Sequence, residues 1–151
     1  FRLQPVLDYR KLSEEKLMLE CVDAKRHLDD EKEILKKLDA ELVDLISELK
    51  EKRNERLSAT DVSFYLSYIN SIKNRGSRQK EVVCRIEEDL EERKAKLADA
   101  AGKRRVLEKM RERKLREYEL SLDDKERKML DETAILRSVR GVNNEKADNF
   151  V

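Results

Sequence analysis

The chain has 151 residues, of which 46% are charged and 38% hydrophobic, with only 3 glycines, 1 proline and no tryptophan. A globular domain of this length has more turn-forming residues and a thicker apolar core, so the composition argues against a compact domain and favours long helices. The formal net charge of +1, from 35 basic and 34 acidic residues, implies no overall attraction to nucleic acid.

The first predicted helix runs from about residue 5 to about residue 57. Pro5 suits a first helical turn, where its missing N–H would have no partner. Apolar residues then recur at steps of four and three, the spacing of a coiled-coil seam, while charged residues fill the positions between them. The seam has Cys21, Leu28, Leu35, Leu42 and Leu49 at a positions, and Leu17, Ala24, Glu31, Leu38 and Leu45 at d positions.

A turn is predicted over residues 58–61. Ser58 and Thr60 offer hydroxyl groups that can cap a helix N-terminus, and Asp61 is favourable in the first turn of the helix that follows. The segment therefore indicates a turn into a second helix and not a flexible linker.

The second predicted helix runs from about residue 62 to residue 140. Gly76 either ends a short helix or is tolerated within a continuous one at about 1 kcal/mol relative to alanine, and we favour continuity with a local kink. Gly141 suits a helix C-cap, and residues 142–151 are predicted to fray. The seam of this helix has Ile69, Gly76, Val83, Leu90, Leu97 and Arg104 at a positions, and Tyr65, Ile72, Gln79, Ile86, Arg93, Ala100 and Leu107 at d positions.

The two stripes predict an all-α fold, an antiparallel coiled-coil hairpin over residues 1–141 in which the second helix is longer and overhangs the first. In the register that centres the hairpin on the predicted turn, Glu31 lies one layer from Arg93, and about residues 119–140 project alone. A parallel homodimer of longer helices is the alternative. The predicted pairs are Leu49 with Ile72, Leu38 with Val83, Leu35 with Ile86, Ala24 with Leu97 and Cys21 with Ala100.

No catalytic or metal-binding constellation can be assembled from the sequence. Cys21 and Cys84 lack metal-site spacing and lie too far apart in the hairpin for a disulfide, so free thiols are expected. Gly102 and Lys103 lack the first glycine and the Ser/Thr of a phosphate-binding loop. We therefore expect no cofactor, no metal and no enzymatic activity. Since no run of 18 apolar residues exists, we expect no membrane span.

Two surfaces could bind partners. The first is an aromatic cluster after the turn, whose members cannot all face one narrow seam: Phe64, Tyr65, Leu66, Tyr68, Ile69 and Ile72. They either anchor a partner or cap the end of the hairpin. The second is the basic run 103–116, which the hairpin would bring close to Arg2, Arg10 and Lys11. Its charge suits an acidic protein collar, a nucleic-acid backbone or an anionic membrane. Alternatively, the run is simply a solvated face of the helix.

Several segments resemble the FliJ family, small coiled-coil proteins of bacterial flagellar type III export. They are the opening FRLQPVLDYR, the leucine seam, the aromatic YLSYINSI, and RRVLEKMRERKLREYE followed by DDKERKMLDETA. The resemblance covers nearly the whole chain. It implies a noncatalytic central stalk that promotes assembly of the export ATPase hexamer, contacts the membrane export gate and escorts export chaperones.

The resemblance also implies a cytoplasmic location, peripheral at the inner face of the bacterial cell membrane. We expect a monomer that binds no nucleic acid; the alternative function is a coiled-coil adaptor that binds RNA or an anionic membrane through residues 103–116. The implied export-gate contacts are Leu42, Tyr65, Tyr68, Ile69 and Ile72. The implied contacts with the ATPase ring are Arg2, Arg10, Lys11, Arg104, Arg111, Lys114 and Tyr118.

Overall fold

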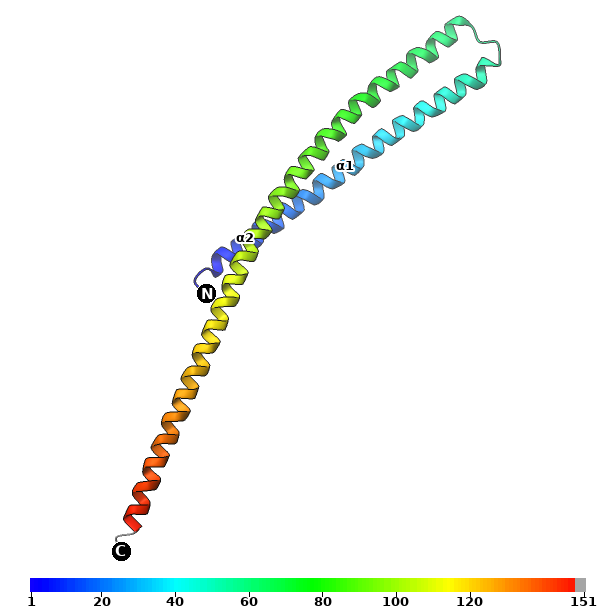
Figure 1. Cartoon of the computed structure of the whole chain (residues 1–151). Coiled ribbons are helices and arrows are strands. Elements are labelled where there is room, and N and C mark those ends of the chain that lie inside the picture. The colour runs from blue at the N-terminus through cyan, green and yellow to red at the C-terminus, as the bar shows by residue number, and fades with distance from the viewer. Residues whose placement is uncertain (149–151) are drawn as a thin grey trace. The chain divides into compact units, whose positions relative to one another are not determined.

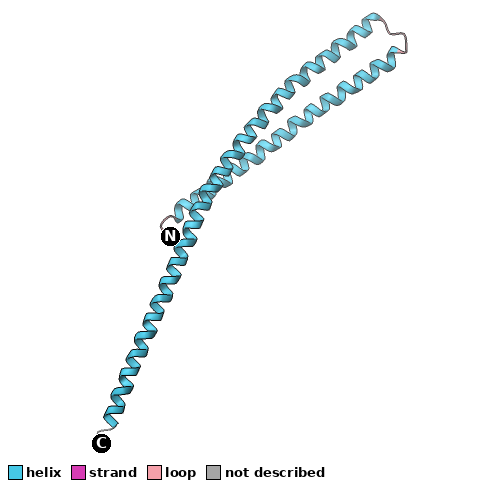
Figure 2. Cartoon of the chain, in the orientation of Figure 1, coloured by secondary structure: helices cyan, strands magenta, loops and turns pink. Residues whose placement is uncertain are grey.

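The computed structural model describes residues 1–148, nearly all of which belong to two helices. Helix α1 spans Gln4–Arg53 and helix α2 spans Ala59–Asp148 (Figure 1). Figure 2 shows that the connection between the two helices is short and not helical. No strand occurs within residues 1–148. The predicted all-α class and the longer second helix are confirmed.

The chain comprises two compact units. The first consists of Phe1–Asp8 together with the chain from Lys103 onward, and the second is Tyr9–Gly102. The second unit contains the turn, the C-terminal part of α1 and the N-terminal part of α2. Hydrogen bonds and ion pairs join the two helices within it, so this unit is an antiparallel hairpin of a single chain.

The core of the hairpin is the predicted seam. Within residues 9–102 the buried apolar residues all lie at a and d positions, and Leu28, Val83 and Leu90 form a cluster against which Ala24, Leu35 and Ile86 pack. Each fully buried Leu, Ile or Val contributes about 1.5–3 kcal/mol relative to exposure. On one flank, Lys32 of α1 pairs with Glu87 of α2 at 2.7 Å. The other buried residues of the unit are Leu38, Ile69, Ile72, Gly76 and Ala100.

The turn occupies residues 54–58, three to four residues earlier than the predicted 58–61. The last turn of α1 tightens into i→i−3 hydrogen bonds, from Asn54 N to Glu51 O and from Glu55 N to Lys52 O. Ser58 then caps α2: the Asp61 N–H donates to Ser58 Oγ at 3.2 Å, and Ser58 Oγ donates to the Asp61 carboxylate at 2.8 Å. This reciprocal arrangement is a variant of the capping box. Ser58 therefore ends the turn, whereas the sequence prediction made it the beginning.

The predicted register is wrong by about one heptad. Val83 was expected opposite Leu38 but clusters with Leu28. Glu31 was expected near Arg93, but it accepts hydrogen bonds from Gln79, while Arg93 pairs with Asp89 and Glu20. The earlier turn explains the error. In an antiparallel hairpin, moving the turn by one residue toward the N-terminus moves the partner of each α1 residue by two residues along α2.

Gly76 lies inside the continuous helix α2, as the favoured alternative requires. It occupies a buried a position, its φ is not positive, and a Cβ atom at this position would meet nothing within 4 Å. We therefore expect Gly76→Ala to raise the free energy of unfolding by about 1 kcal/mol, because alanine costs less backbone entropy in a helix. Urea unfolding followed by circular dichroism measures this. A loss of stability would mean that the seam has no room for the methyl group.

The first unit has little buried surface. Leu7 is fully buried, Arg104 and Leu107 are half-buried, and every side chain described beyond Glu108 is exposed. Helix α2 passes through Gly141, whose φ is not positive, so the predicted C-cap at this glycine is wrong. Residues 142–148, expected to fray, belong to α2, and residues 149–151 lie outside the described part of the chain. The Glu, Lys and Ala residues after Gly141 favour the helix.

Candidate functional site

The side chains around the turn differ in how much of their surface is exposed and can contact a partner. Of the five implied gate contacts, Tyr68 is 40% exposed, and Leu42 and Tyr65 are half-buried. Ile69 and Ile72 are buried in the seam, so their side chains support the hairpin and form no part of its surface.

One flank of the turn end is closed by hydrogen bonds between the helices. Tyr68 Oη of α2 donates to Glu41 of α1 at 2.7 Å, and Tyr65 Oη donates to Glu48 at 3.1 Å. Lys52 Nζ donates to Tyr65 Oη at 2.6 Å and pairs with Glu48 at 3.0 Å. We call these five residues the tyrosine bracket. They connect the two helices next to the turn.

The hydrogen bonds of the tyrosine bracket shift the pKa values of three of its members. Hydrogen bonds from Lys52 and then Tyr65 lower the pKa of Glu48 below its usual value. The pKa of Lys52 is raised by its hydrogen bonds with Tyr65 and Glu48, and that of Tyr68 is raised mainly by its hydrogen bond to Glu41. These directions keep Glu48 ionised, Lys52 charged and Tyr68 protonated at neutral pH, which are the states that the bracket requires.

The other flank of the turn end is open and carries a groove of about 710 Å³. The groove lies between the end of α1, the turn and the start of α2. Its apolar wall consists of Ile46, Leu49, Leu57, Val62 and Leu66, and its polar rim of Lys50, Arg53, Asn54, Glu55 and Arg56. This groove was not expected from the sequence. Ile46 and Leu66 lie at e positions, one beside the seam on each helix, and two apolar e residues near a turn could have indicated it.

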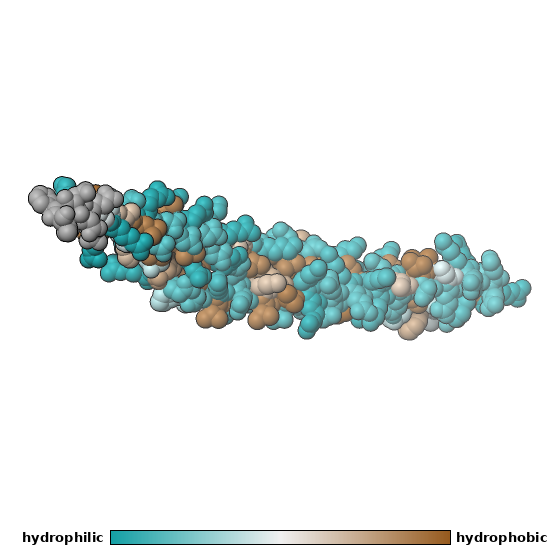
Figure 3. Space-filling model, turned by 90° about the horizontal axis from the view of Figure 1, so that it is seen from below, coloured by the Kyte–Doolittle hydropathy of each residue, from teal (hydrophilic) through white to brown (hydrophobic). Residues whose placement is uncertain are grey.

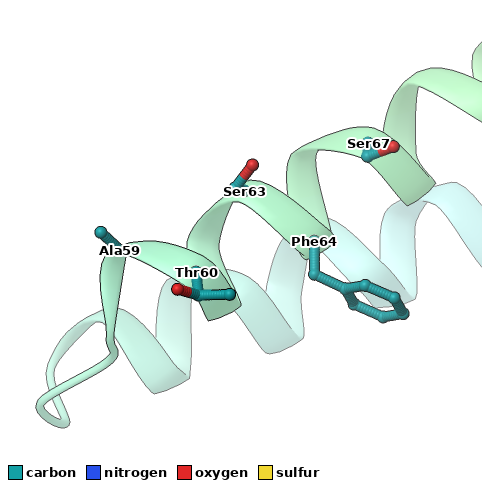
Figure 4. A pocket seen from close by; sticks show the side chains of 5 residues that line it. All are labelled: Ala59, Thr60, Ser63, Phe64 and Ser67. Carbon is teal, nitrogen blue, oxygen red and sulfur yellow. The ribbon is translucent and has the colours of Figure 1, made fainter.

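A third surface lies at the start of α2, formed by residues outside the a and d positions of the seam. A shallow depression there is lined by Ala59, Thr60, Ser63, Phe64 and Ser67 (Figure 4). Figure 4 shows the Phe64 ring projecting from the helix, and this side chain is 74% exposed. Phe64 is therefore the aromatic residue of the predicted cluster that is most available as an anchor.

The basic run belongs to the first unit and is largely exposed. Several of its cations are paired along the helix: Arg104 with Glu108 at 2.5 Å, Lys114 with Glu117 at 3.2 Å and Arg116 with Glu112 at 3.9 Å. The space-filling view in Figure 3 shows a mainly hydrophilic face with separate hydrophobic patches. Within residues 119–142 the exposed apolar side chains are Leu120, Leu122, Met129, Leu130, Ile135, Leu136, Val139 and Val142.

The residues implied to contact the ATPase ring are divided between the two units. Arg2, Arg104, Arg111, Lys114 and Tyr118 belong to the first, and Arg10 and Lys11 to the second. Arg2, Arg111, Lys114 and Tyr118 are exposed, whereas the other three are half-buried.

Cys21 and Cys84 are free thiols. No group of three or more His, Cys, Asp or Glu side chains that could hold a metal ion occurs among the described residues. Within the same range, neither helix has an apolar stretch long enough to cross a membrane. The surfaces with distinctive shape or charge are the candidates for binding a partner.

Comparison with known proteins identifies a family to which the chain is similar. A family model described as "Flagellar FliJ protein" matches residues 1–143. A search of curated proteins and a search of solved structures each found no match. The matched segment includes the hairpin, the turn end and the basic run.

Proposed function

Because the chain belongs to the FliJ family and is a component of the flagellar export apparatus, we propose that it serves there as a noncatalytic central stalk. In this role it promotes assembly of the export ATPase hexamer, contacts the membrane export gate and escorts export chaperones. It works in the cytoplasm, at the inner face of the cell membrane, as a monomer.

The observation that carries the proposal is the continuity of α2. One uninterrupted helix, Ala59–Asp148, bears both the aromatic residues next to the turn and the basic run 103–116. Gly76 and Gly102 lie within it without positive φ. A single helix that carries two different binding surfaces suits a protein that connects two partners.

We assign the gate contact to the turn end. Tyr68 and its half-buried neighbours Leu42 and Tyr65 form the contact surface, and Ile69 and Ile72 hold it in place from the seam. Tyrosines are effective anchors because they combine a large apolar ring with a hydroxyl group and lose little conformational entropy on binding.

We assign the ring contact to the basic residues Arg2, Arg10, Lys11, Arg104, Arg111 and Lys114, together with Tyr118. The exposed members suit an acidic collar in the ATPase pore, and such charge complementarity accelerates association. A ring around this part of α2 would also cover the exposed apolar side chains of residues 119–142, which are otherwise in contact with water.

The ring contact is tested by measuring hexamer assembly and ATP hydrolysis of the export ATPase with and without this chain. We expect the chain to promote assembly, and Arg111→Glu/Lys114→Glu to reduce that effect at least tenfold. Lys73→Glu/Lys80→Glu, which reverses two exposed lysines of the hairpin, is the matched control and should retain it. If the unmodified chain neither binds the ATPase nor alters its assembly, the stalk function is wrong.

The same variants distinguish the alternative function. An adaptor that binds RNA or an anionic membrane would lose binding steeply as salt increases, and Arg111→Glu/Lys114→Glu would weaken it. Several cations of the run have glutamate partners on the same helix, so the net charge available to any anionic partner is reduced, and the salt dependence of binding distinguishes the two functions.

A further inference from the structure

The turn end of the hairpin has two unlike flanks. In an antiparallel coiled coil the g positions of the two helices meet on one side of the seam and the e positions on the other. On the g side, Tyr68 and Glu41 close the space with a hydrogen bond. On the e side, Ile46 and Leu66 lie beside the groove and leave it open.

The wall of the groove is apolar and only partly covered. Leu49 and Val62 belong to the seam but are only half-buried, and Leu66 is 55% exposed. Farther along the hairpin an e-side ion pair, Lys32 with Glu87, covers the seam. The groove is therefore a place where the hairpin's own side chains leave apolar seam residues partly exposed.

The rim of the groove is basic. Lys50, Arg53 and Arg56 line it, opposed by the single carboxylate of Glu55. In the described part of the chain none of these three cations forms an ion pair, in contrast to Lys52, which is held in the tyrosine bracket. Three cations beside an apolar wall attract carboxylates that flank an apolar surface.

We infer that this groove binds an amphipathic helix of a partner protein whose aliphatic side chains are flanked by Asp or Glu. The side chains of two adjacent helices form ridges and grooves into which a third helix can pack. The bound helix then inserts anchor residues at i, i+3, i+4 and i+7. The aliphatic anchors would contact Leu49, Val62 and Leu66, and the carboxylates would pair with the rim. This inference goes beyond the proposed function, because it holds whether or not the tyrosine bracket contacts the export gate.

The test uses the full chain and three fluorescent synthetic peptides measured by anisotropy. The first is a helical peptide with leucines at i, i+3, i+4 and i+7 and glutamates beside them; the second has lysines in place of the glutamates; the third is a scrambled version of the first. We expect the glutamate peptide to bind at least tenfold more tightly than the other two. Equal binding of all three, or no binding of the glutamate peptide, would overturn the inference.

Variants locate the binding site. Leu66→Asp adds a charge to the exposed part of the wall and should weaken binding of the glutamate peptide at least tenfold. Arg53→Glu/Arg56→Glu should reverse the preference in favour of the lysine peptide. Phe64→Ala alters another surface of the turn end and should leave affinity unchanged. Circular dichroism checks that each variant remains folded, and loss of binding in Phe64→Ala instead of Leu66→Asp would place the site elsewhere.

Discussion

Replacing Ile72 by alanine is expected to lower the free energy of unfolding by about 2–4 kcal/mol. Ile72 is only 2% exposed and lies at a d position of a seam formed by just two helices. The truncation removes buried apolar surface, and such a narrow core has few neighbouring side chains that can move in to fill the space. Urea unfolding followed by circular dichroism measures the effect.

Phe64→Ala is the matched control for Ile72→Ala. Phe64 is a larger side chain from the same segment, but it is 74% exposed, so its removal should change stability by no more than about 0.5 kcal/mol. The comparison also separates two roles. If Ile72→Ala weakened gate binding without lowering stability, Ile72 would contact the partner directly, and its assignment to the seam would be wrong.

Replacing Gln79 by leucine is expected to destabilise the hairpin by about 1–3 kcal/mol, although leucine is the usual seam residue. Gln79 Nε2 donates to the backbone carbonyl of Glu31 at 3.0 Å and to its carboxylate at 2.5 Å. The Glu31 side chain is only 21% exposed, so the substitution leaves a partly buried carboxylate without this donor. An uncompensated buried charge costs more than the new apolar contact contributes.

The double variant Glu31→Leu/Gln79→Leu should recover the stability of the natural chain or exceed it, because both polar groups are then absent. A double-mutant cycle with Glu31→Leu gives the coupling energy. If Gln79→Leu alone were stabilising, the hydrogen bonds between Gln79 and Glu31 would have no energetic role. The polar pair also favours one register, as single polar residues do in other coiled coils, so the double variant tests whether the leucines alone maintain the alignment.

The sequence allowed the seam to be predicted residue by residue, but not the alignment of the two helices. Heptad spacing identifies which residues face the partner, since a side chain's position on a helix depends only on local periodicity. A shift of one heptad still matches a with d positions, so periodicity alone does not distinguish neighbouring registers. The alignment is decided by the turn, and there Ser58 marks the end of the connection and not its beginning.

The candidate site was predictable only in part. Aromatic clustering drew attention to the turn end and included Tyr68, but it also included Ile69 and Ile72, which the seam buries. Their burial follows from their a and d positions and could have been inferred. The groove was missed because it combines Ile46, Leu66 and three cations from separate segments, and their proximity depends on where the turn lies.

We expect the capped turn to determine the order in which the hairpin closes. The contact between Lys52 and Tyr65 joins residues 13 apart in sequence, that between Glu41 and Tyr68 residues 27 apart, and that between Glu31 and Gln79 residues 48 apart. Since the entropy lost on loop closure increases with loop length, the pairs nearest Ser58 form first and bring the next pairs together, as in a zipper. During translation the leucines of α1 therefore leave the ribosome well before their partners and remain exposed until α2 is synthesised.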